Sequence, residues 1–424
     1  MNGGPAPESG PGPLGGVLVV DLSRALAGPH AAMMLGDLGA RVIKVESPGR
    51  GDDSRSWGPP FVPGRDGERH STYFLSCNRN KESIALDLKS ADGRSVLTGL
   101  LRRADVLVEN FRPGVLDRLG FGVAALSELN PRLVVLSITG FGHDGPAGTR
   151  AGYDQIAQGE GGLMSLTGPD AGHPTRVGVP IGDLLAGIYG AYGVVSALYE
   201  RGATGRGRVV RTSLLAAIVG VHAFQGTRYT VAGEVPEPTG GHHPSICPYG
   251  LFTSSDGYVQ ISVGSESLWR RFAPAFGVDR PEWLSNEDRV GDRDAVIAAI
   301  NHAFGRFTSK ELLSELTGLG VPAGQVRNLR EVYTWEQTRS QGLLVDVNHA
   351  ALGPITLPGS AIRFDDQPFA GGRARHEAPP VLDQHGPAIR AWLAADGRPD
   401  TGGSALPGRN LRDDLLSQYL KRRE

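Results

Sequence analysis

The sequence predicts an α/β fold with a large parallel-sheet domain and a smaller second domain. The first observation is that short apolar runs alternate with helical segments along the first half of the chain. The second is that a strand, a helix and another strand follow one another within about 30 residues, which is the length of a βαβ unit. The composition, 40% hydrophobic and 21% charged residues, is that of a globular protein. Because βαβ units give parallel pairing, we expect helices on both faces of the sheet.

The first unit follows a tail rich in proline, glycine and serine. Residues 1–15 have low complexity and are predicted to be disordered. The apolar run 16–22 is short enough to be a buried strand. A helix is expected over 28–39, because it opens with Pro29 in its first turn and ends at a glycine that can cap it. Residues 41–46 are the second strand.

The same alternation continues to about residue 213. Helices are expected at 91–103, 124–129 and 183–200, and strands at 105–109, 133–138 and 207–213.

The character of the chain changes after about residue 220. Residues 231–250 are dense in glycine and proline and have no periodicity, which is typical of a functional loop or a linker. A strand and three helices follow and predict a smaller domain; they are 258–263, 266–276, 292–306 and 309–319. Short strands are expected between 343 and 369, and residues 397–408 are expected to be mobile.

Charge and cysteine content exclude several classes of protein. The formal net charge is −2, which gives no electrostatic footprint for nucleic acid or for an anionic membrane. Cys77 and Cys247 are far apart, so neither a disulfide framework nor a zinc ribbon is expected. There is no signal-peptide pattern, and the uncharged run 184–199 is shorter than the roughly 20 residues that span a bilayer. We therefore expect a cytoplasmic protein with no nucleic-acid or membrane partner.

Common catalytic signatures are missing from the chain. No GxGxxG follows the first strand, and neither a Walker lysine loop nor a GxSxG elbow is found. His242, His243 and Cys247 could in principle ligate a metal. Adjacent histidines on an extended segment point to opposite faces, however, so we expect no metal site there and favour a loop that lines a pocket.

Asp183 is the only formally charged residue between Arg176 and Glu200, and it stands where a long apolar run begins. A charge that enters the interior needs a partner, an unpaired backbone donor or a function. Two interpretations follow from the residues alone. Asp183 is either the N-terminal cap of the helix or a catalytic carboxylate.

The carboxyl ends of the predicted strands carry polar side chains, and ligands of open α/β sheets bind at those ends. The residues in question are Lys44, Glu46, Glu109, Asn110, Phe111 and Thr139, with Lys81, Lys89 and Arg118 on the connecting segments. The alternative for each is an ordinary solvated face.

An ordered series of short motifs resembles the class III (CaiB/BaiF-type) CoA-transferases, which include formyl-CoA transferase and the carnitine CoA-transferases. The series runs from about residue 16 to 392. It comprises AGP (27–29), LGARVIKVE (38–46), GD (51–52) with Arg55, LDLK (86–89), DVLVENFRPG (105–114), LDRLG (116–120), GYD (152–154) and GD (182–183).

The resemblance implies an intertwined homodimer whose large Rossmann-like domain is built from the N-terminal half and the C-terminal tail. The corresponding expected boundaries are 16–216 for the large domain, 217–239 for a linker, 240–334 for an inserted α+β domain and 335–424 for the returning segment. Coenzyme A would be a substrate and product rather than a permanently bound cofactor, and the partners would be an acyl-CoA and a small carboxylic or dicarboxylic acid.

The resemblance also implies the reaction. Asp183 would attack the donor thioester to give a mixed anhydride, then carry CoA as an aspartyl thioester to the acceptor acid. An ordinary aspartate is ionised near pH 7, so we expect a nucleophile that needs no general base. Gly240 and Gly241 would stabilise the oxyanions through backbone N–H groups. The family's CoA contacts carry over to Ala27, Lys89, Asn110 and Phe111, with Arg118 pairing with phosphate.

Three positions depart from formyl-CoA transferase. Leu26 replaces a glutamine, Ser47 replaces a CoA-binding arginine and Thr139 replaces a lysine that approaches CoA. We therefore expect other cations, such as Arg55 or Lys81, to hold the nucleotide end.

The nearest alternative is an α-methylacyl-CoA racemase, which shares the fold. Racemases use a histidine where this chain has Tyr153, and tyrosine is a poor base at neutral pH. The loop 242–249 is similar to that of transferases that act on mesaconate, itaconate or citramalate with succinyl-CoA. Arg176, His242 and His243 are then expected to pair with the remote carboxylate of the acid.

Overall fold

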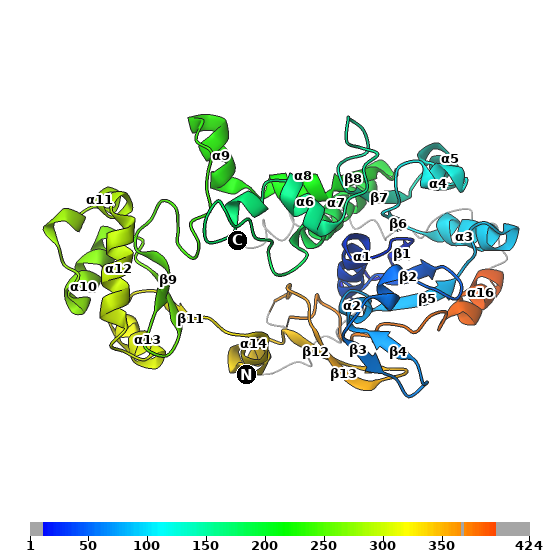
Figure 1. Ribbon diagram of the computed structural model, residues 1–424. Coiled ribbons are helices and arrows are strands. Elements are labelled where there is room, and N and C mark those ends of the chain that lie inside the picture. The colour runs from blue at the N-terminus through cyan, green and yellow to red at the C-terminus, as the bar shows by residue number, and fades with distance from the viewer. Residues whose placement is uncertain (1–11, 366–368, 396–424) are drawn as a thin grey trace, which may run out of the picture. The chain divides into compact units, whose positions relative to one another are not determined.

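The computed structural model describes residues 12–365 and 369–395 (Figure 1). The chain forms two compact units. The large unit holds Met1–Ala157, Pro180–Val221 and Arg339–Glu424, and the small unit holds Gln158–Val179 and His222–Thr338. Most of the tail 1–15 and all of residues 397–408 lie outside the described part of the chain.

A six-stranded parallel sheet forms the centre of the large unit, in the strand order β5-β2-β1-β6-β7-β8. Its strands are β1 (Leu18–Asp21), β2 (Arg41–Glu46), β5 (Lys81–Ala85), β6 (Val106–Glu109), β7 (Val134–Thr139) and β8 (Val209–Ser213). The predicted parallel sheet is confirmed. Its strand order reverses between β1 and β6. Ligands of open α/β sheets bind at such a switch point, beside the carboxyl ends of the two strands, and this region is called the crevice.

Helices cover both faces of this sheet, because alternate residues of each strand point to opposite sides. Leu133 and Val135 of the β7 segment share a core with α3 (Ala91–Arg103), α5 (Val123–Leu129) and α16 (Gly386–Ala395). Leu136 and Ile138 point the other way, toward α7 (Ile181–Thr204). The remaining helical segments of the large unit are α1 (Ala27–Asp37), η1 (Asp53–Ser56), α2 (Thr72–Ser76), α4 (Val115–Arg118) and α8 (Leu214–Gly220).

The helix α7 has the length and composition to cross a bilayer, although the sequence alone suggested a shorter apolar run. In the large unit one side of this helix packs against α1, α8, β7 and β8, and 39% of its apolar stretch is buried. Gly187 allows the close approach to α1. A Cβ atom at this position would lie only 2.8 Å from the carbonyl oxygen of Ala27.

The segment after Arg339 packs with the large unit. The β12 (Leu344–His349) and β13 (Gly353–Pro358) hairpin comes first. The chain then runs along the edge strand β5, where the N–H of His385 donates to the carbonyl oxygen of Ser83 at 2.9 Å. A second hairpin joins β3 (Phe61–Pro63) to β4 (Arg69–Ser71).

The small unit has a three-stranded antiparallel sheet and helices around a core rich in aromatic side chains. The strands are β9 (Tyr249–Thr253), β10 (Tyr258–Ser262) and β11 (Ala323–Gln325). The main helices are α10 (Glu266–Phe276), α11 (Asn286–Gly291), α12 (Arg293–Phe304), α13 (Ser309–Gly318) and α14 (Leu329–Thr334), with η2 (Met164–Leu166) and η3 (Pro281–Trp283). Residues 158–179, inside the expected large-domain range, cluster with this unit.

Three further helices lie where the chain passes between the units. They are α6 (Asp154–Glu160), α9 (Ala223–Ala232) and α15 (Glu336–Ser340). The segment 217–239, expected to be a linker, therefore contains all of α9 and the end of α8.

Candidate active site

A pair of hydrogen bonds joins two loops at the switch point. The loop after β1 and the loop after β6 meet there. The Asn110 side chain donates from Nδ2 to the Arg24 carbonyl oxygen at 2.7 Å and accepts the Arg24 N–H at 2.8 Å. Asn110 thus fixes the two loops to each other.

Asp183 lies in the first turn of α7, beside the loop that follows β1. The next residue, Leu184, packs with Leu26, Tyr73 and buried Cys77. These side chains come from segments that are far apart in the sequence. They place the start of α7 against the start of α1.

The cap of α7 is provided by Asp154 and not by Asp183. The N-cap position is Pro180, which has no side-chain cap bond. Oδ1 of Asp154 accepts the N–H of Gly182 at 2.8 Å and that of Asp183 at 3.4 Å. Among the described residues, no group donates a hydrogen bond to the Asp183 carboxylate. The capping interpretation of Asp183 is therefore wrong, and its side chain is available for another role.

Burial, and next the negative charge of Asp154, raise the pKa of Asp183 from 3.8 to about 7. One pKa unit corresponds to about 1.4 kcal/mol, so these effects outweigh the roughly 0.3–1 kcal/mol by which a helix N-terminus favours an anion. The expectation of a fully ionised aspartate is thus corrected. A share of the Asp183 carboxyl groups is therefore protonated near neutral pH.

Tyr73 lies close enough to Asp183 for the carboxylate charge to affect the pKa of its hydroxyl. Burial, and next the charge of Asp183, raise the pKa of the Tyr73 hydroxyl, which remains protonated at neutral pH. Its ring stands edge-on to Trp57, with centroids 4.9 Å apart. Sequence reasoning assigned no role to Tyr73 or Asp154. The only signal for Asp154 was its place in the GYD motif.

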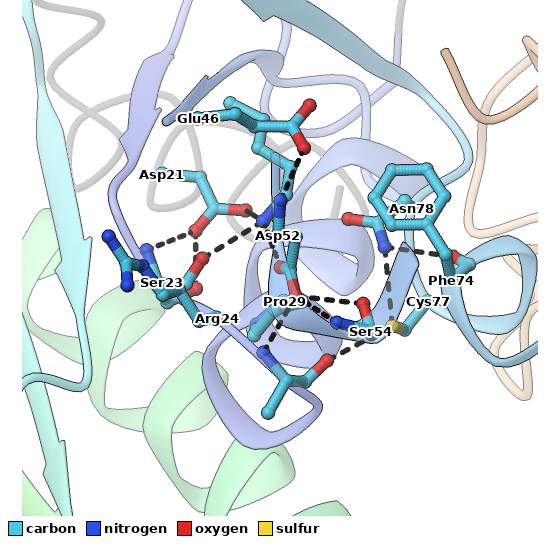
Figure 2. A network of polar contacts seen from close by, with 12 residues as sticks. Asp21, Ser23, Arg24, Pro29, Glu46, Asp52, Ser54, Phe74, Cys77 and Asn78 are labelled. Carbon is cyan, nitrogen blue, oxygen red and sulfur yellow. Dashed lines mark hydrogen bonds and ion pairs between the residues drawn. The ribbon is translucent and has the colours of Figure 1, made fainter. Parts of the chain in front are cut away.

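A buried ionic network lies beneath the crevice (Figure 2). Nζ of Lys44 donates to the Ser23 carbonyl oxygen at 2.9 Å and lies 2.8 Å from Oδ2 of Asp52. Nζ of Lys81 contacts Oδ2 of Asp21 at 2.9 Å. Lys44, Lys81 and Asp21 are buried, and their charges are compensated by one another.

This network holds the loop that enters α1. Oδ1 of Asp52 accepts the N–H of Ala25 at 3.1 Å. Ala25 has a φ of 64°, in the left-handed region that a non-glycine residue adopts only when its surroundings enforce it. Burial opposes the ionisation of Asp52, but the Lys44 charge and hydrogen bonds from Ser54 outweigh it and lower the pKa of Asp52 to about 2.

Arg55 and Lys81 were expected to offer positive charge to a nucleotide, and the structure corrects this. Arg55 donates two hydrogen bonds to Glu46, at 2.7 and 2.8 Å, and its guanidinium lies 3.6 Å from the centre of the Phe74 ring. Lys81 is buried with Asp21. Both cations form ion pairs with carboxylates inside the fold. Lys44 and Glu46 are also paired there.

The expected CoA contacts all lie at the carboxyl end of the sheet. Ala27 begins α1 and is buried, whereas Asn110 and Phe111 follow β6 at the crevice. Arg118 ends α4 and Lys89 follows β5, and both are exposed. Ala27, Asn110 and Phe111 are thus brought to the crevice, while Lys89 and Arg118 flank it on connecting segments.

Gly240 and Gly241 lie in the small unit. Gly240 has a φ of 59°, and its N–H donates to the Gly168 carbonyl oxygen at 3.1 Å. The Gly241 carbonyl oxygen accepts the N–H of Leu251 at 3.0 Å. Within the described chain no acceptor takes the N–H of Gly241. Of the two expected oxyanion donors, only Gly241 therefore has a backbone N–H to offer.

The histidines of the neighbouring loop are part of an aromatic stack. His243 lies between Phe224 and Tyr249, with centroid distances of 5.5 and 5.1 Å. Burial and the charge of Arg293 lower the pKa of both His242 and His243. A lowered pKa favours the neutral form of each ring, which can donate a hydrogen bond to a carboxylate.

Other candidates from the sequence are placed as follows. Arg176 is exposed, and its Nη1 donates to the Val177 carbonyl oxygen at 3.0 Å. Tyr153, at the position of the racemase histidine, has an exposed side chain. No group of three or more His, Cys, Asp or Glu residues that could hold a metal ion occurs in the described part of the chain.

Comparison with known proteins shows the family of this chain. Residues 14–386 match the profile of CoA-transferase family III. The human succinyl-CoA:glutarate CoA-transferase is 39% identical over 378 residues, which cover 88% of this chain and 84% of the relative. The succinate–glutarate CoA-transferase of Agrobacterium fabrum is 37% identical, covering 90% and 96% of the two chains. The acetyl-CoA:oxalate CoA-transferase of Acetobacter aceti is 36% identical, covering 92% and 98%.

Solved structures give the same result. A CaiB/BaiF family protein from Brucella suis superposes with a TM-score of 0.80 at 38% identity, covering 90% of this chain and 99% of its own. Rv3272 from Mycobacterium tuberculosis gives a TM-score of 0.76 at 27% identity, covering 89% and 99%. With its profile match, its relatives and its crevice at the switch point, this chain belongs to CoA-transferase family III and is a CoA-transferase.

Proposed function

We propose that the enzyme moves CoA from succinyl-CoA to a small dicarboxylic acid through covalent intermediates on Asp183. One observation carries this proposal. Asp154 takes over the capping of α7, so the Asp183 carboxylate is held at the crevice without a hydrogen-bond donor of its own. A half-buried carboxylate with a raised pKa and no hydrogen-bond donor is a candidate nucleophile.

The reaction proceeds by four acyl transfers. An oxygen of ionised Asp183 attacks the succinyl thioester, and CoA thiolate leaves. The thiolate attacks the Asp183 carbonyl carbon of the anhydride, which releases succinate and forms an aspartyl-CoA thioester. The acceptor carboxylate attacks that thioester, and thiolate leaves again. Thiolate then attacks the acceptor's carbonyl carbon, which frees the product thioester and restores the Asp183 carboxylate.

Each transfer passes through an oxyanion that needs hydrogen-bond donors. A single donor of this kind typically contributes about 3 kcal/mol to the transition state. The unpaired N–H of Gly241 is the proposed backbone donor. Tyr73, whose hydroxyl stays protonated beside Asp183, is proposed as a second donor.

Succinyl-CoA and glutarate are the first substrates to test. Relatives named succinyl-CoA:glutarate CoA-transferase share 39% identity with this chain, and those named for mesaconate and D-citramalate share 36% and 31%. We propose glutarate as acceptor ahead of mesaconate, itaconate and citramalate. His242, His243 and Arg176 are the proposed donors to the remote carboxylate of the acid.

We also propose that two chains form an interlocked homodimer in the cytoplasm, without a membrane or nucleic-acid partner. Ile188, Tyr192, Val195 and Tyr199 of α7 are 42%, 72%, 37% and 85% exposed in the single chain. Their spacing places them on one face of the helix. A contiguous exposed apolar stripe of this kind marks a protein–protein interface.

The covalent intermediate can be trapped. The purified enzyme is incubated with succinyl-CoA and hydroxylamine, digested and analysed by mass spectrometry. A hydroxamate is expected on Asp183, and an Asp183→Ala variant should yield none and should lose transfer to glutarate while keeping its circular dichroism. A hydroxamate on another residue, or transfer retained by Asp183→Ala, would refute the mechanism. Exchange of the α-proton with deuterated water, without acyl transfer, would favour the racemase.

A further inference from the structure

Arg24 presents an uncompensated positive charge at the crevice. Its side chain is exposed, and its Nη2 donates to Oγ of Ser47 at 3.2 Å. No carboxylate of the described residues lies within ion-pair distance of its guanidinium. The other cations nearby, Lys44, Lys81 and Arg55, all have carboxylate partners. Arg24 is therefore the cation at this end of β1 that remains available to a ligand.

The position of Arg24 is fixed from both sides of its backbone. Asn110 binds its N–H and its carbonyl oxygen, at 2.8 and 2.7 Å. The preceding Ser23 carbonyl oxygen accepts from buried Lys44, and the following Ala25 N–H donates to Asp52 (Figure 2). These hydrogen bonds hold the backbone of Arg24 at the crevice, unlike that of an ordinary surface arginine.

The side chain is also oriented. The guanidinium carbon lies 5.6 Å from the centre of the Phe111 ring, on the loop after β6. The bond to Ser47 reaches the loop after β2. The side chain of Arg24 thus spans from β6 to β2, across the carboxyl end of β1. An arginine has five N–H donors, and the neutral Ser47 hydroxyl occupies only one of them.

We propose that Arg24 binds phosphate of the CoA moiety and supplies the positive charge that Ser47 lacks. This inference rests on the proposed function, because it takes the crevice to be the CoA site. A planar guanidinium binds phosphate oxygens in a bidentate manner, and exposed phosphate is the anionic part of the acyl-CoA that such a fork recognises. Arg24 is a binding residue and takes no part in the acyl transfers.

Three variants of the full chain test this inference. Arg24→Met keeps the side-chain stem and removes the charge, whereas Arg24→Lys keeps the charge and removes the fork. Arg102→Met is the matched control, since Arg102 is an exposed arginine at the end of α3, which lies away from the carboxyl ends of the strands. Binding of CoA, 3′-dephospho-CoA and pantetheine is measured by calorimetry, and KM and kcat are measured for succinyl-CoA and succinyl-pantetheine.

Arg24→Met should weaken CoA binding and raise the KM for succinyl-CoA by about 10- to 100-fold, as expected for loss of a hydrogen-bonded charge. Its kcat and its KM for succinyl-pantetheine should stay within about twofold of the wild type. Arg24→Lys should recover part of the affinity, and Arg102→Met should behave as wild type. If dephospho-CoA binding is also weakened by Arg24→Met, the contact is to the diphosphate; if it is not, the contact is to the 3′-phosphate.

Two results would overturn the inference. One is an unchanged affinity for CoA in Arg24→Met. The other is an equal loss for pantetheine and CoA, which would mean that Arg24 acts on the loop and not on phosphate. Neither result would affect the Asp183 hydroxamate, so failure of this inference is distinguishable from failure of the proposed function.

Discussion

Two regions at the carboxyl end of the sheet shift the pKa of a carboxylate in opposite directions. In the network below the crevice, Asp52 lies 2.8 Å from Nζ of Lys44 and has its pKa lowered to about 2. At the start of α7, Asp183 has a second carboxylate, Asp154, as its neighbour, and its pKa is raised to about 7. Burial acts in the same direction on both carboxylates. The Lys44 cation and the hydrogen-bond donors around Asp52, which Asp183 lacks, decide the outcome.

The comparison separates a structural role from a reactive one. A buried carboxylate with a cation and several donors is stabilised as an anion and holds its loop in place. A buried carboxylate without them is destabilised as an anion, which costs folding free energy and leaves the oxygen atoms unshielded. The compensated region therefore provides the rigid floor, and the uncompensated region provides the proposed nucleophile.

Removing the Lys44 charge from the buried network should produce the largest loss of stability. Lys44→Met leaves Asp52 and Asp21 with less compensation in the interior, and the free energy of unfolding near pH 7 should fall by about 3–5 kcal/mol, as for other broken buried ion pairs. Urea denaturation followed by circular dichroism measures this. Arg102→Met, which removes an exposed cation, should change it by less than about 0.5 kcal/mol.

The pH dependence of this loss sharpens the test. Because the pKa of Asp52 is lowered in the folded protein, its contribution to stability is present above pH 4, near its ordinary pKa, and is lost as the pH falls through about 2. The stability difference between Lys44→Met and the wild type should therefore shrink in acid. Equal stability of the two proteins near pH 7 would contradict the structural role of the network.

Replacing Asp183 by a neutral residue should increase the free energy of unfolding, whereas Lys44→Met should decrease it. The pKa of Asp183 is raised, so the folded protein is stabilised below the ordinary aspartate pKa, and that stability is lost as the pH rises through about 7. Asp183→Asn should therefore be more stable than the wild type by about 1–3 kcal/mol at about pH 8, and nearly equal to it at about pH 4. Denaturation at the two pH values measures this. Asp279→Asn, an exposed change in the small unit, should show no such difference, and a destabilised Asp183→Asn at the higher pH would contradict the prediction.

Asp154→Asn is expected to have the smallest effect of these substitutions, a shift in the pH dependence of kcat/KM. The amide oxygen of asparagine can still accept the N–H groups of Gly182 and Asp183, so the cap is kept while the negative charge is removed. The value of kcat/KM should rise with pH until Asp183 is ionised, and the apparent pKa of this profile should fall by about one unit in the variant. It should stay above the ordinary aspartate value, because burial is the larger cause of the shift. An unchanged profile would show that Asp154 acts only as a cap.

The sequence was sufficient for the elements that depend on local pattern. The predicted strands 41–46 and 105–109 correspond to the central parallel strands β2 and β6, and Asn110 and Phe111 follow β6 at the crevice. The position of Asp183 at the head of an apolar helix was also visible. These features follow from periodicity and from the switch-point rule.

Partnerships between distant residues were not predictable. Whether Lys81 faces a ligand or Asp21 depends on a contact across 60 positions. Lys81 proved to be buried and paired, and Arg55 proved to be partly buried and paired. The pairing of Asp154 with the first turn of α7 depends on a contact across 28 positions. Consequently the pKa of Asp183 was expected to be ordinary, although the residue itself was correctly placed.

The two carboxylates also occupy special places along the chain. The chain passes from the large unit into the small unit after Ala157, three residues beyond Asp154, and returns at Pro180, three residues before Asp183. Each member of the pair thus stands beside one of the four points at which the chain crosses between the units. The two carboxylates therefore flank the segment Gln158–Val179, and the two ends of that segment bring together the pair that sets the acidity of Asp183.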